Sequence, residues 1–348
     1  MPVSIRDVAK SAGVSLATVS KVLNNAAGAQ ISLEKRERVR KVAAELGYRP
    51  SAIARAMVRK QIDTIGIMLP RGVNTPLSSP FFGALMDGIF QAAADCGQNM
   101  MVFTGHTWVD AATSLPIYQD GRCDGLIVLY QLEKQQILPA LLDAGIPAVL
   151  VNDTYEDPRM SRVDVDSTAG AEEMTSYLIR LGHRRIGFIY GSFRFSWAQL
   201  RLQGYEQALR EAGISPNPAW IPGRAVDEDS WHKAGIQVEQ LMRLPDDQRP
   251  TALFCVNDEI AVRTLQVLAA KGVRVPQDIS VAGFNDDIMA DRQSPPLTTM
   301  RQPYSQIGEQ AVHLLLQQVK DIDSRGIVAE LLPELVVRAS TAPPPSSA

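Results

Sequence analysis

The stretch IRDVAKSAGVSLATVSKVLN, residues 5–24, decides the fold of the N-terminal part of this chain. Ala9, Gly13 and Val19 lie where a helix-turn-helix needs a small residue, a turn residue with positive φ and a β-branched packing residue. The remaining apolar positions between the two helices are Val8, Ala12, Val14 and Val22. This pattern predicts a helix-turn-helix that binds DNA.

The second helix of this motif is expected to begin after Ser15, whose hydroxyl can accept a hydrogen bond from an otherwise unpaired backbone N–H. Leu16, Ala17 and Thr18 follow in its first turn and are predicted to point outward, as the side chains of a recognition helix do in the major groove. A third helix is predicted to end before Gly47.

The charge of the chain is divided unevenly between its two parts. Residues 1–60 hold 12 Lys and Arg against 4 Asp and Glu, a net charge of +8. Subtracting these from the 35 basic and 38 acidic residues of the whole chain leaves 23 and 34, a net charge of −11. Phosphates attract the basic part and repel the acidic part, which would orient the molecule on DNA. A basic surface can also be a solvated helical face, and only its combination with the motif favours DNA binding.

Length and composition limit the remaining possibilities. A chain of 348 residues with 45% apolar residues has room for two or three domains. We expect neither a membrane span nor a secretory signal, and therefore a cytoplasmic, nucleoid-associated protein. Cys96, Cys123 and Cys255 stand apart from one another and are expected to be reduced. No metal site and no cofactor is predicted.

After residues 1–60, which we call the head, the pattern changes to alternating strands and helices. This alternation predicts parallel sheets in two lobes. Strands are expected at 64–69, 100–103, 125–129, 148–151, 186–190, 253–256 and 279–284. Helices are expected at 81–96, 169–181, 198–212, 259–271 and 307–319. A short run at 51–60 is too short to be a stable helix alone and is a candidate hinge. The Pro- and Ser-rich end, 341–348, is expected to be disordered.

Stretches spread over nearly the whole chain resemble one family. They are DVAKSAGVSLATVSKVLN, LGYRPSAIAR, CDGLIVL, GIPAVLV, LIRLGHRRIGFIYG, RLQGYEQAL, VNDEIAV, VPQDISVAGFNDD and PPLTTMRQP. Their order and spacing resemble the lactose-repressor/galactose-repressor family of bacterial transcription regulators.

The family resemblance implies a helix-turn-helix domain at 1–50, a hinge helix at 51–60 and a type I periplasmic-binding-protein core at 61–340. Each lobe of that core has a Rossmann-like sheet, and an effector binds in the cleft between the lobes. The first lobe is expected at about 61–160 and 294–326, and the second at about 161–293 and 327–340.

On the head, the resemblance implies that Leu16 and Ala17 read bases, with Lys21 further along the helix. Since neither Leu nor Ala carries a hydrogen-bonding side chain, direct readout is expected to be weak, by apolar contact with a thymine methyl, and indirect readout more important. The expected phosphate contacts are Ser4, Thr18, Ser20, Asn24 and Tyr48, and each small hydroxyl among them could instead cap a helix or turn. Ser15, the expected N-cap, is also counted among the DNA-binding residues. In the hinge, Ala54 and Met57 are expected in the minor groove, with Met57 as the inserted wedge. Packing of Met57 against its symmetry mate is the alternative.

In the core, the resemblance implies that Arg201 hydrogen-bonds the effector, a surface salt bridge being the alternative. Asn257 and Asp258 follow a strand end where ligands bind in open α/β sheets, although Asp258 could cap the next helix. Asn285 stands where many relatives carry Asp, which puts in doubt any ligand that needs a carboxylate there. The other expected effector contacts are Phe81, Phe82, Asn152, Asp153, Phe195, Trp197 and Trp231. The aromatic residues among them suit a sugar ring or a purine, and core packing is their alternative.

These patterns predict a homodimeric repressor of a carbohydrate-use operon that binds near-palindromic operator DNA under the control of a sugar-like effector. A regulator of the same kind that responds to a nucleobase is the first alternative. A solute-binding protein would need an export signal and no DNA-binding head. An enzyme is not expected, because the chain has no P-loop, no nucleophile elbow and no His-rich metal cluster.

Overall fold

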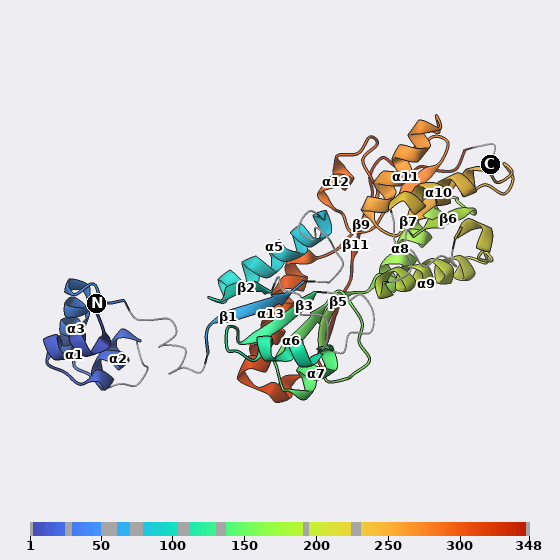
Figure 1. Ribbon diagram of the computed structural model, residues 1–348. Helices are drawn as coiled ribbons and strands as arrows, with labels where there is room; N and C mark the ends of the chain where they lie inside the picture. The colour runs from blue at the N-terminus through green and yellow to red at the C-terminus, as the bar shows by residue number, and fades with distance from the viewer. Residues whose placement is uncertain are drawn as a thin grey trace. The chain divides into compact units, whose positions relative to one another are not determined.

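The computed structural model describes residues 3–24, 30–49, 61–69, 79–103, 111–129, 137–190, 195–223 and 231–345. The chain divides into two compact units, Met1–Thr64 with Gly121–Asp124, and Ile65–Asp120 with Gly125–Ala348. Figure 1 shows the helices and strands of each unit. Within the described ranges, none of the helices has the length and apolar content that crossing a membrane requires.

The head consists of α1 (Ile5–Ala12), α2 (Leu16–Leu23) and α3 (Leu33–Glu45) around a small apolar core. Its buried side chains are Val8, Ala9, Ala12, Val19, Val22, Val39 and Ala43, and Val14 packs against them. The turn between α1 and α2 is made by Gly13, which has φ 65°, a left-handed conformation that costs a glycine least. The helix-turn-helix prediction is confirmed.

The first lobe of the larger unit is built on a six-stranded parallel sheet in the order β10-β5-β4-β3-β1-β2. Its strands are β1 (Thr64–Met68), β2 (Asn99–Phe103), β3 (Gly125–Leu129), β4 (Ala148–Val151), β5 (Ser161–Val165) and β10 (Val328–Leu331). All residues of β3 and β4 are buried, as expected of central strands covered on both faces.

The helices of this lobe in the described ranges are α5 (Pro80–Asp95), α6 (Ala111–Tyr118), α7 (Ile137–Asp143) and α13 (Tyr304–Lys320), followed by the short helix η3 (Ile322–Ser324). α13 packs on β3, β4 and β5 and also on α5 (Figure 1). The two helices cross at Gly88 and Gly308, where an added Cβ on Gly308 would overlap the backbone of Gly88. α6 and α7 pack against each other.

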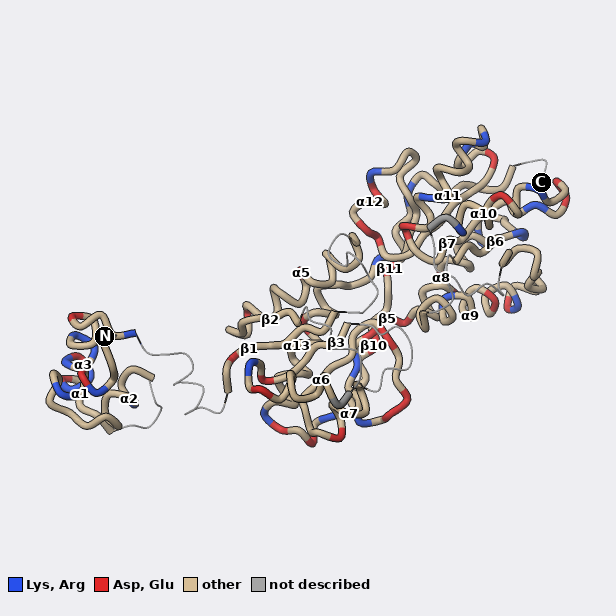
Figure 2. The backbone as a smooth tube through the Cα atoms, in the orientation of Figure 1, with Lys and Arg blue, Asp and Glu red and all other residues tan. Residues whose placement is uncertain are grey.

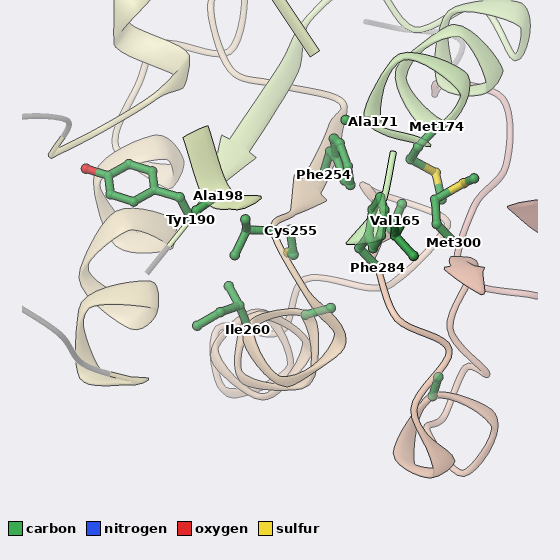
Figure 3. Close-up of a cluster of buried hydrophobic side chains, with 14 of the residues drawn as sticks. Val165, Ala171, Met174, Tyr190, Ala198, Phe254, Cys255, Ile260, Phe284 and Met300 are labelled. Carbon is green, nitrogen blue, oxygen red and sulfur yellow. The ribbon is translucent and has the colours of Figure 1, made fainter. Parts of the chain in front are cut away.

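The second lobe has a three-stranded parallel sheet, in the order β6-β7-β8, and a larger set of helices. The strands are β6 (Ile186–Ile189), β7 (Ala252–Cys255) and β8 (Ser280–Ala282). The helices are α8 (Ser167–Arg180), α9 (Ser196–Glu211), η2 (Pro218–Trp220), α10 (Trp231–Met242), α11 (Asp258–Ala270) and α12 (Ile288–Asp291). α8 pairs with α9 and α10 with α11, and side chains such as Phe254 and Phe284 fill the core (Figure 3).

Among the described residues of the larger unit, two strands lie outside both parallel sheets. β9 (Thr299–Arg301) and β11 (Glu334–Val336) pair antiparallel to form a two-stranded ribbon. Bridges from Ala282 to Thr298 and from Asn285 to Arg301 connect the ribbon to the end of β8.

The predicted lobe boundaries need correction at two strands. β5 and β10 were expected in the second lobe, but they pair with each other and β5 pairs with β4, so both belong to the first sheet. The first segment of the first lobe therefore runs through Val165 rather than ending at 160. The reason is that β5 alternates apolar and polar residues, Arg162 and Asp164 among them, and gives no continuous apolar signal.

The predicted disordered tail is also wrong where the structure describes it. The amide of Ala342 donates to Ser280 Oγ at 3.0 Å, and its carbonyl lies 2.9 Å from His183 Nε2. The Thr341 hydroxyl lies 2.9 Å from that of Tyr177. Composition suggested disorder, but Tyr177 of α8, His183 and Ser280 of β8 offer hydrogen-bonding partners that hold residues 341 and 342. Residues 346–348 lie outside the described residues.

Candidate DNA-binding face and inter-lobe site

The first turn of α2 has the predicted geometry of a recognition helix. Ser15 is its N-cap, and Ser15 Oγ accepts from the Thr18 amide at 3.1 Å and lies 2.9 Å from Thr18 Oγ1. Leu16 is 45% exposed, and Ala17 and Lys21 are also exposed. The side chains presented to solvent at the predicted base-reading positions are therefore apolar, with one cation a turn further along.

Several predicted phosphate contacts are already hydrogen-bonded within the head. The Ser4 hydroxyl donates to Asp7 at 2.7 Å, and Asn24 Nδ2 donates to Ser20 Oγ at 3.2 Å. Tyr48 is half-buried and packs against the apolar core of the head. A hydroxyl that accepts one of these bonds can still donate to a phosphate. Ala54 and Met57, the predicted minor-groove residues, lie outside the described residues.

Basic side chains are concentrated on the third helix of the head. Figure 2 shows Lys and Arg along α3. The sequence of that helix, LEKRERVRKVAAE, holds five of them among thirteen residues. Two of these form exposed ion pairs four residues apart, Arg38 with Glu34 and Lys41 with Glu45. Exposed pairs of this kind are weak, so these cations remain exchangeable partners for phosphate.

In the larger unit, Arg201 of α9 is the most deeply buried cation among the predicted site residues, at 2% exposure. Its Nη1 donates to the Val256 carbonyl at 2.7 Å and its Nε to Ser167 Oγ at 3.4 Å. The guanidinium lies 3.6 Å from the ring centroid of Phe284 and 4.9 Å from that of Trp197. A surface salt bridge, the alternative considered for Arg201, is therefore wrong.

The charge of Arg201 is maintained by acidic groups from both lobes. Burial lowers the pKa of Arg201 to about 10, and Tyr304, Asp164, Asp258 and Asp287 oppose that shift. In the other direction, burial raises the pKa of Asp164 and of Asp258 to about 7, and that of Asp287 to about 6. These residues form one electrostatically coupled group.

Asp258 serves the structure of this group instead of capping a helix. Asp258 Oδ2 accepts from the Asp287 amide at 2.8 Å and Oδ1 from the Thr299 hydroxyl at 2.6 Å, and the residue has no exposed surface. The cap of α11 is Asn257, whose side chain accepts from the Ile260 amide at 2.9 Å. Asp258 thus fixes the loop after β8 against β9.

Asn285 lies in the loop that Asp258 fixes. It is 5% exposed and has φ 129°. Its amide donates to the Met300 carbonyl at 2.7 Å, and its Oδ1 accepts from Gln302 Nε2 at 2.6 Å. Asn285 Nδ2 is 3.4 Å from Asp287 Oδ2, and the Tyr304 hydroxyl donates to Asp287 Oδ1 at 3.3 Å. Asp287 therefore supplies a carboxylate two residues after Asn285, which stands where many relatives carry Asp.

Asn152 and Asp153 follow β4, as predicted. Asn152 is 7% exposed, has φ 60°, and its amide donates to the Val163 carbonyl at 3.0 Å. The hydroxyl of Ser196, the first residue of α9, donates to Asp153 Oδ1 at 2.7 Å. This hydrogen bond brings a residue of the first lobe to one of the second.

The predicted aromatic residues separate into two groups. Phe195 and Trp197 stack with ring centroids 5.1 Å apart and an interplanar angle of 12°. Phe81 packs edge-on against Tyr304 at 5.7 Å and against Phe82 at 5.5 Å. Phe82 is 2% exposed in the core of the first lobe, which favours core packing for that residue.

Trp231 begins α10, and its side chain lies outside the described residues. Arg194 and Arg224, two further cations of interest for an acidic ligand, lie outside them as well. Five residues of this site were not predicted from the sequence, namely Asp164, Ser196, Asp287, Gln302 and Tyr304. Asp287 had a usable signal, since it ends the GFNDD run, whereas Asp164 and Tyr304 come together with it only through the fold.

The head carries an exposed recognition helix and many basic residues. The core has two lobes with parallel α/β sheets and a buried polar group between them. This combination is typical of a DNA-binding regulator whose core binds a ligand. Residues 4–51 match the family model of bacterial regulatory proteins of the lacI family, and residues 175–341 match that of the periplasmic binding protein-like domain. The chain belongs to the lacI family of bacterial regulatory proteins.

Relatives of known function agree with this family. The ribose operon repressor of Haemophilus influenzae is 35% identical over 340 residues, which cover 97% of this chain and 98% of the relative. The HTH-type transcriptional repressor PurR of Photobacterium profundum is 33% identical over 340 residues, with 97% and 98% covered. The predicted class, a DNA-binding transcriptional repressor, is confirmed.

Solved structures show the same fold. The lac repressor dimer bound to operator and the anti-inducer ONPF has a TM-score of 0.79 at 27% identity, covering 98% of this chain and 100% of that one. The complex of the transcriptional regulator CelR with cellobiose has a TM-score of 0.70 at 28% identity, covering 97% and 99%.

Proposed function

We propose that this chain is a homodimeric, cytoplasmic repressor of a carbohydrate-use operon, controlled by a sugar or sugar derivative that binds between the lobes of the core. The observation that carries the proposal is the Arg201 group. A cation lying against Phe284 and near Trp197, with carboxyls supplied from both lobes, offers apolar faces and polar edges together. A sugar ring has the same two kinds of surface.

The names of one relative and of one solved structure support a sugar effector. The similarity to a ribose operon repressor and to a regulator solved with cellobiose supports a carbohydrate effector. The similarity to PurR supports a second candidate, a nucleobase effector. The parallel stack of Phe195 and Trp197 favours this candidate specifically, because a planar base could extend it.

On DNA, we propose that two heads bind the half-sites of a near-palindromic operator, as the lac repressor dimer bound to operator suggests. Leu16 and Ala17 would contact bases through apolar atoms, Lys21 and the hydroxyls of α2 would contact phosphates, and Ala54 and Met57 would enter the minor groove. Direct readout by α2 would then be weak, and the shape and deformability of the operator would contribute more.

The experiment has two steps. The full chain is used to select a duplex from a random DNA pool, and log K is then measured against log salt. A steep negative slope is expected from phosphate contacts, and a flat one would exclude operator binding.

In the second step, thermal unfolding is measured with D-ribose, D-glucose, cellobiose, sugar phosphates and hypoxanthine. A ligand at 100 times its Kd adds about 2.7 kcal/mol to the free energy of unfolding. A shift with a sugar and none with hypoxanthine supports the carbohydrate proposal. The reverse result establishes the nucleobase candidate.

A further inference from the structure

Two hydrogen bonds of the same chemical kind connect the lobes of the core. The Ser196 hydroxyl donates to Asp153 Oδ1 at 2.7 Å, and the Tyr304 hydroxyl donates to Asp287 Oδ1 at 3.3 Å. In each pair a neutral hydroxyl meets a carboxylate. A similar bond, from the Thr299 hydroxyl to Asp258 Oδ1 at 2.6 Å, joins β9 of the two-stranded ribbon to α11 of the second lobe.

The two bonds are arranged in opposite senses. Asp153 follows β4 of the first lobe, and Ser196 begins α9 of the second. Asp287 precedes α12 of the second lobe, and Tyr304 begins α13, which packs on the first sheet. Each lobe therefore supplies one carboxylate and one hydroxyl, so that separating the lobes leaves one of each on both sides.

These carboxylates belong to the coupled group around Arg201. The charge of Asp153 acts on Asp164, and the charges of Asp164 and Asp287 act on Arg201. Asp287 is only 6% exposed, so its carboxylate needs a hydrogen-bond donor to remain charged at low cost. In the structure, the hydroxyl of Tyr304 is one such donor.

We propose that Ser196 and Tyr304 are internal competitors of the effector: their hydroxyls occupy acceptor positions on Asp153 and Asp287 that hydroxyls of the effector take when it binds. The inference rests on the proposed function and narrows it. The effector is then a neutral polyhydroxylated molecule, because hydroxyls replace hydroxyls without adding charge.

An anionic ligand fits this arrangement poorly. The carboxyls of Asp164, Asp258 and Asp287 act on Arg201, and that of Asp153 acts on Asp164, so the described part of the site is rich in acidic groups. A carboxylate or phosphate placed against Asp153 and Asp287 would meet like charge, which costs binding energy at short range. Sugar acids and sugar phosphates are therefore expected to bind more weakly than the corresponding neutral sugars.

The first arm of the test needs no ligand. In the full chain, the double variant Ser196→Ala/Tyr304→Phe removes only two hydroxyls and keeps the ring of Tyr304 against Phe81. Hydrogen–deuterium exchange is expected to increase in segments 150–157 and 284–304, because two of the hydrogen bonds between the lobes are lost. Unchanged exchange in both segments would overturn the proposal.

A matched control removes two hydroxyls that act inside one lobe each. Tyr177 bonds to Thr341 within the second lobe, and Ser324 donates to the Asp321 carbonyl at 2.7 Å within the first. The double variant Tyr177→Phe/Ser324→Ala is expected to leave exchange in segments 150–157 and 284–304 unchanged. An equal increase in this control would show a general loss of stability and would contradict the inter-lobe role.

The second arm measures binding of D-ribose, D-glucose and cellobiose by calorimetry, with D-gluconate and glucose 6-phosphate as anionic comparisons. Removing an internal competitor should tighten binding of a neutral sugar by about two- to tenfold for each hydroxyl, the range that net hydrogen-bond energies imply. Unchanged or weaker binding by the variants would overturn the proposal, as would preference for an anionic sugar. If no sugar binds the native protein, the proposed carbohydrate function fails, and the exchange measurement still decides the inter-lobe bonds.

Discussion

On the DNA-binding head, the face proposed to contact bases is exposed and apolar, whereas the group proposed to bind the effector between the lobes of the core is buried and charged. Leu16 is 45% exposed and Ala17 is exposed, while Arg201 is 2% exposed and Asp258 has no exposed surface. In both places the polar atoms are largely paired inside the protein. The difference lies in what can replace these hydrogen bonds. On the head, water or phosphate can replace them, whereas between the lobes a ligand must supply an equivalent hydrogen bond for each one that it breaks.

This contrast teaches where specificity resides in the molecule. A ligand between the lobes must supply matching hydrogen bonds, because unpaired buried groups are costly there. This requirement does not apply to the exposed surface of the head. Much of its affinity for DNA can therefore come from phosphate contacts and from the shape of the DNA. We therefore expect larger effects from substitutions between the lobes than from substitutions on the head.

The largest expected effect is that of Arg201→Ala. Removing the guanidinium takes its hydrogen bonds from the Val256 carbonyl and from Ser167 and removes its charge from the buried carboxyls nearby. The free energy of unfolding should fall by about 1.5–3 kcal/mol, the usual worth of a hydrogen bond made by a charged group. The variant should no longer respond to the effector, while its head should still bind DNA. Chemical denaturation and operator titration measure the two effects.

Arg201→Lys is the matched control, since it retains the charge and loses the planar fork. Its stability should lie between those of the native protein and Arg201→Ala. Native stability in Arg201→Ala would show that the carboxyls do not depend on this cation.

The second largest effect is expected when Leu16, the exposed first residue of α2, is replaced by a side chain that can hydrogen-bond to a base. Leu16→Gln should introduce preference for adenine at one position of each half-site, worth about 1–3 kcal/mol of discrimination if both amide atoms pair. Operator selection from a random pool with the variant and the native protein measures the change. The same substitution at exposed Leu33, the first residue of α3, serves as control. Identical selected sequences for Leu16→Gln and the native protein would mean that this side chain does not face bases.

The third effect concerns pH. Burial raises the pKa of Asp258 from 3.8 to about 7, so between these values the folded protein holds a proton that the unfolded chain releases. Because the unfolded state then binds fewer protons, stability falls as pH rises through this window, by at most about 1.4 kcal/mol per pH unit for one carboxyl. His183 acts in the opposite sense, since burial lowers its pKa from 6.5.

Asp258→Asn should make the decline between pH 5 and pH 7 less steep, and the raised pKa values of Asp164 and Asp287 account for the part that remains. The amide can keep both bonds, with Oδ1 accepting from the Asp287 amide and Nδ2 donating to the Thr299 hydroxyl. Denaturant unfolding at several pH values provides the measurement. A variant with the native pH profile would show that another group carries the titration.

The smallest expected effect is the loss of a helix cap on the head. Ser15→Ala removes the acceptor of the Thr18 amide and should cost about 1 kcal/mol of head stability. Ser15→Asp restores the acceptor and should recover that stability, yet it should weaken operator binding if Ser15 lies near a phosphate. Thermal unfolding and DNA titration of the pair separate the capping role from a phosphate contact; equal stability of both variants would contradict the cap.

The head was largely predictable from the sequence because its signals are local. Gly13 in a left-handed turn and the Ser15 cap depend on neighbouring residues, and the structure confirms both. In the core, strands with continuous apolar runs such as β3 were predicted, while β5 and β10 were assigned to the wrong lobe. Their pairing partners are far away in the sequence, which no local pattern reveals.

The inter-lobe site was only partly predictable for the same reason. Arg201, Asp153 and Asn285 lie in recognisable motifs. Asp164 and Tyr304 reach the site because β5 belongs to the first sheet and α13 packs on it, so that their role depends on the assembled lobes. For Asp258, the local pattern suggested a helix cap, and the structure uses the carboxylate to hold Asp287 and Thr299 instead.

The most direct test of the central claim is the affinity of the full chain for its selected operator duplex, measured by fluorescence anisotropy with and without the neutral sugar that raises thermal stability most. Coupling between the two sites predicts a change of about 5- to 150-fold in the operator Kd. A sugar that binds and leaves the operator Kd unchanged, or an operator affinity that responds to hypoxanthine and to no sugar, would contradict the claim.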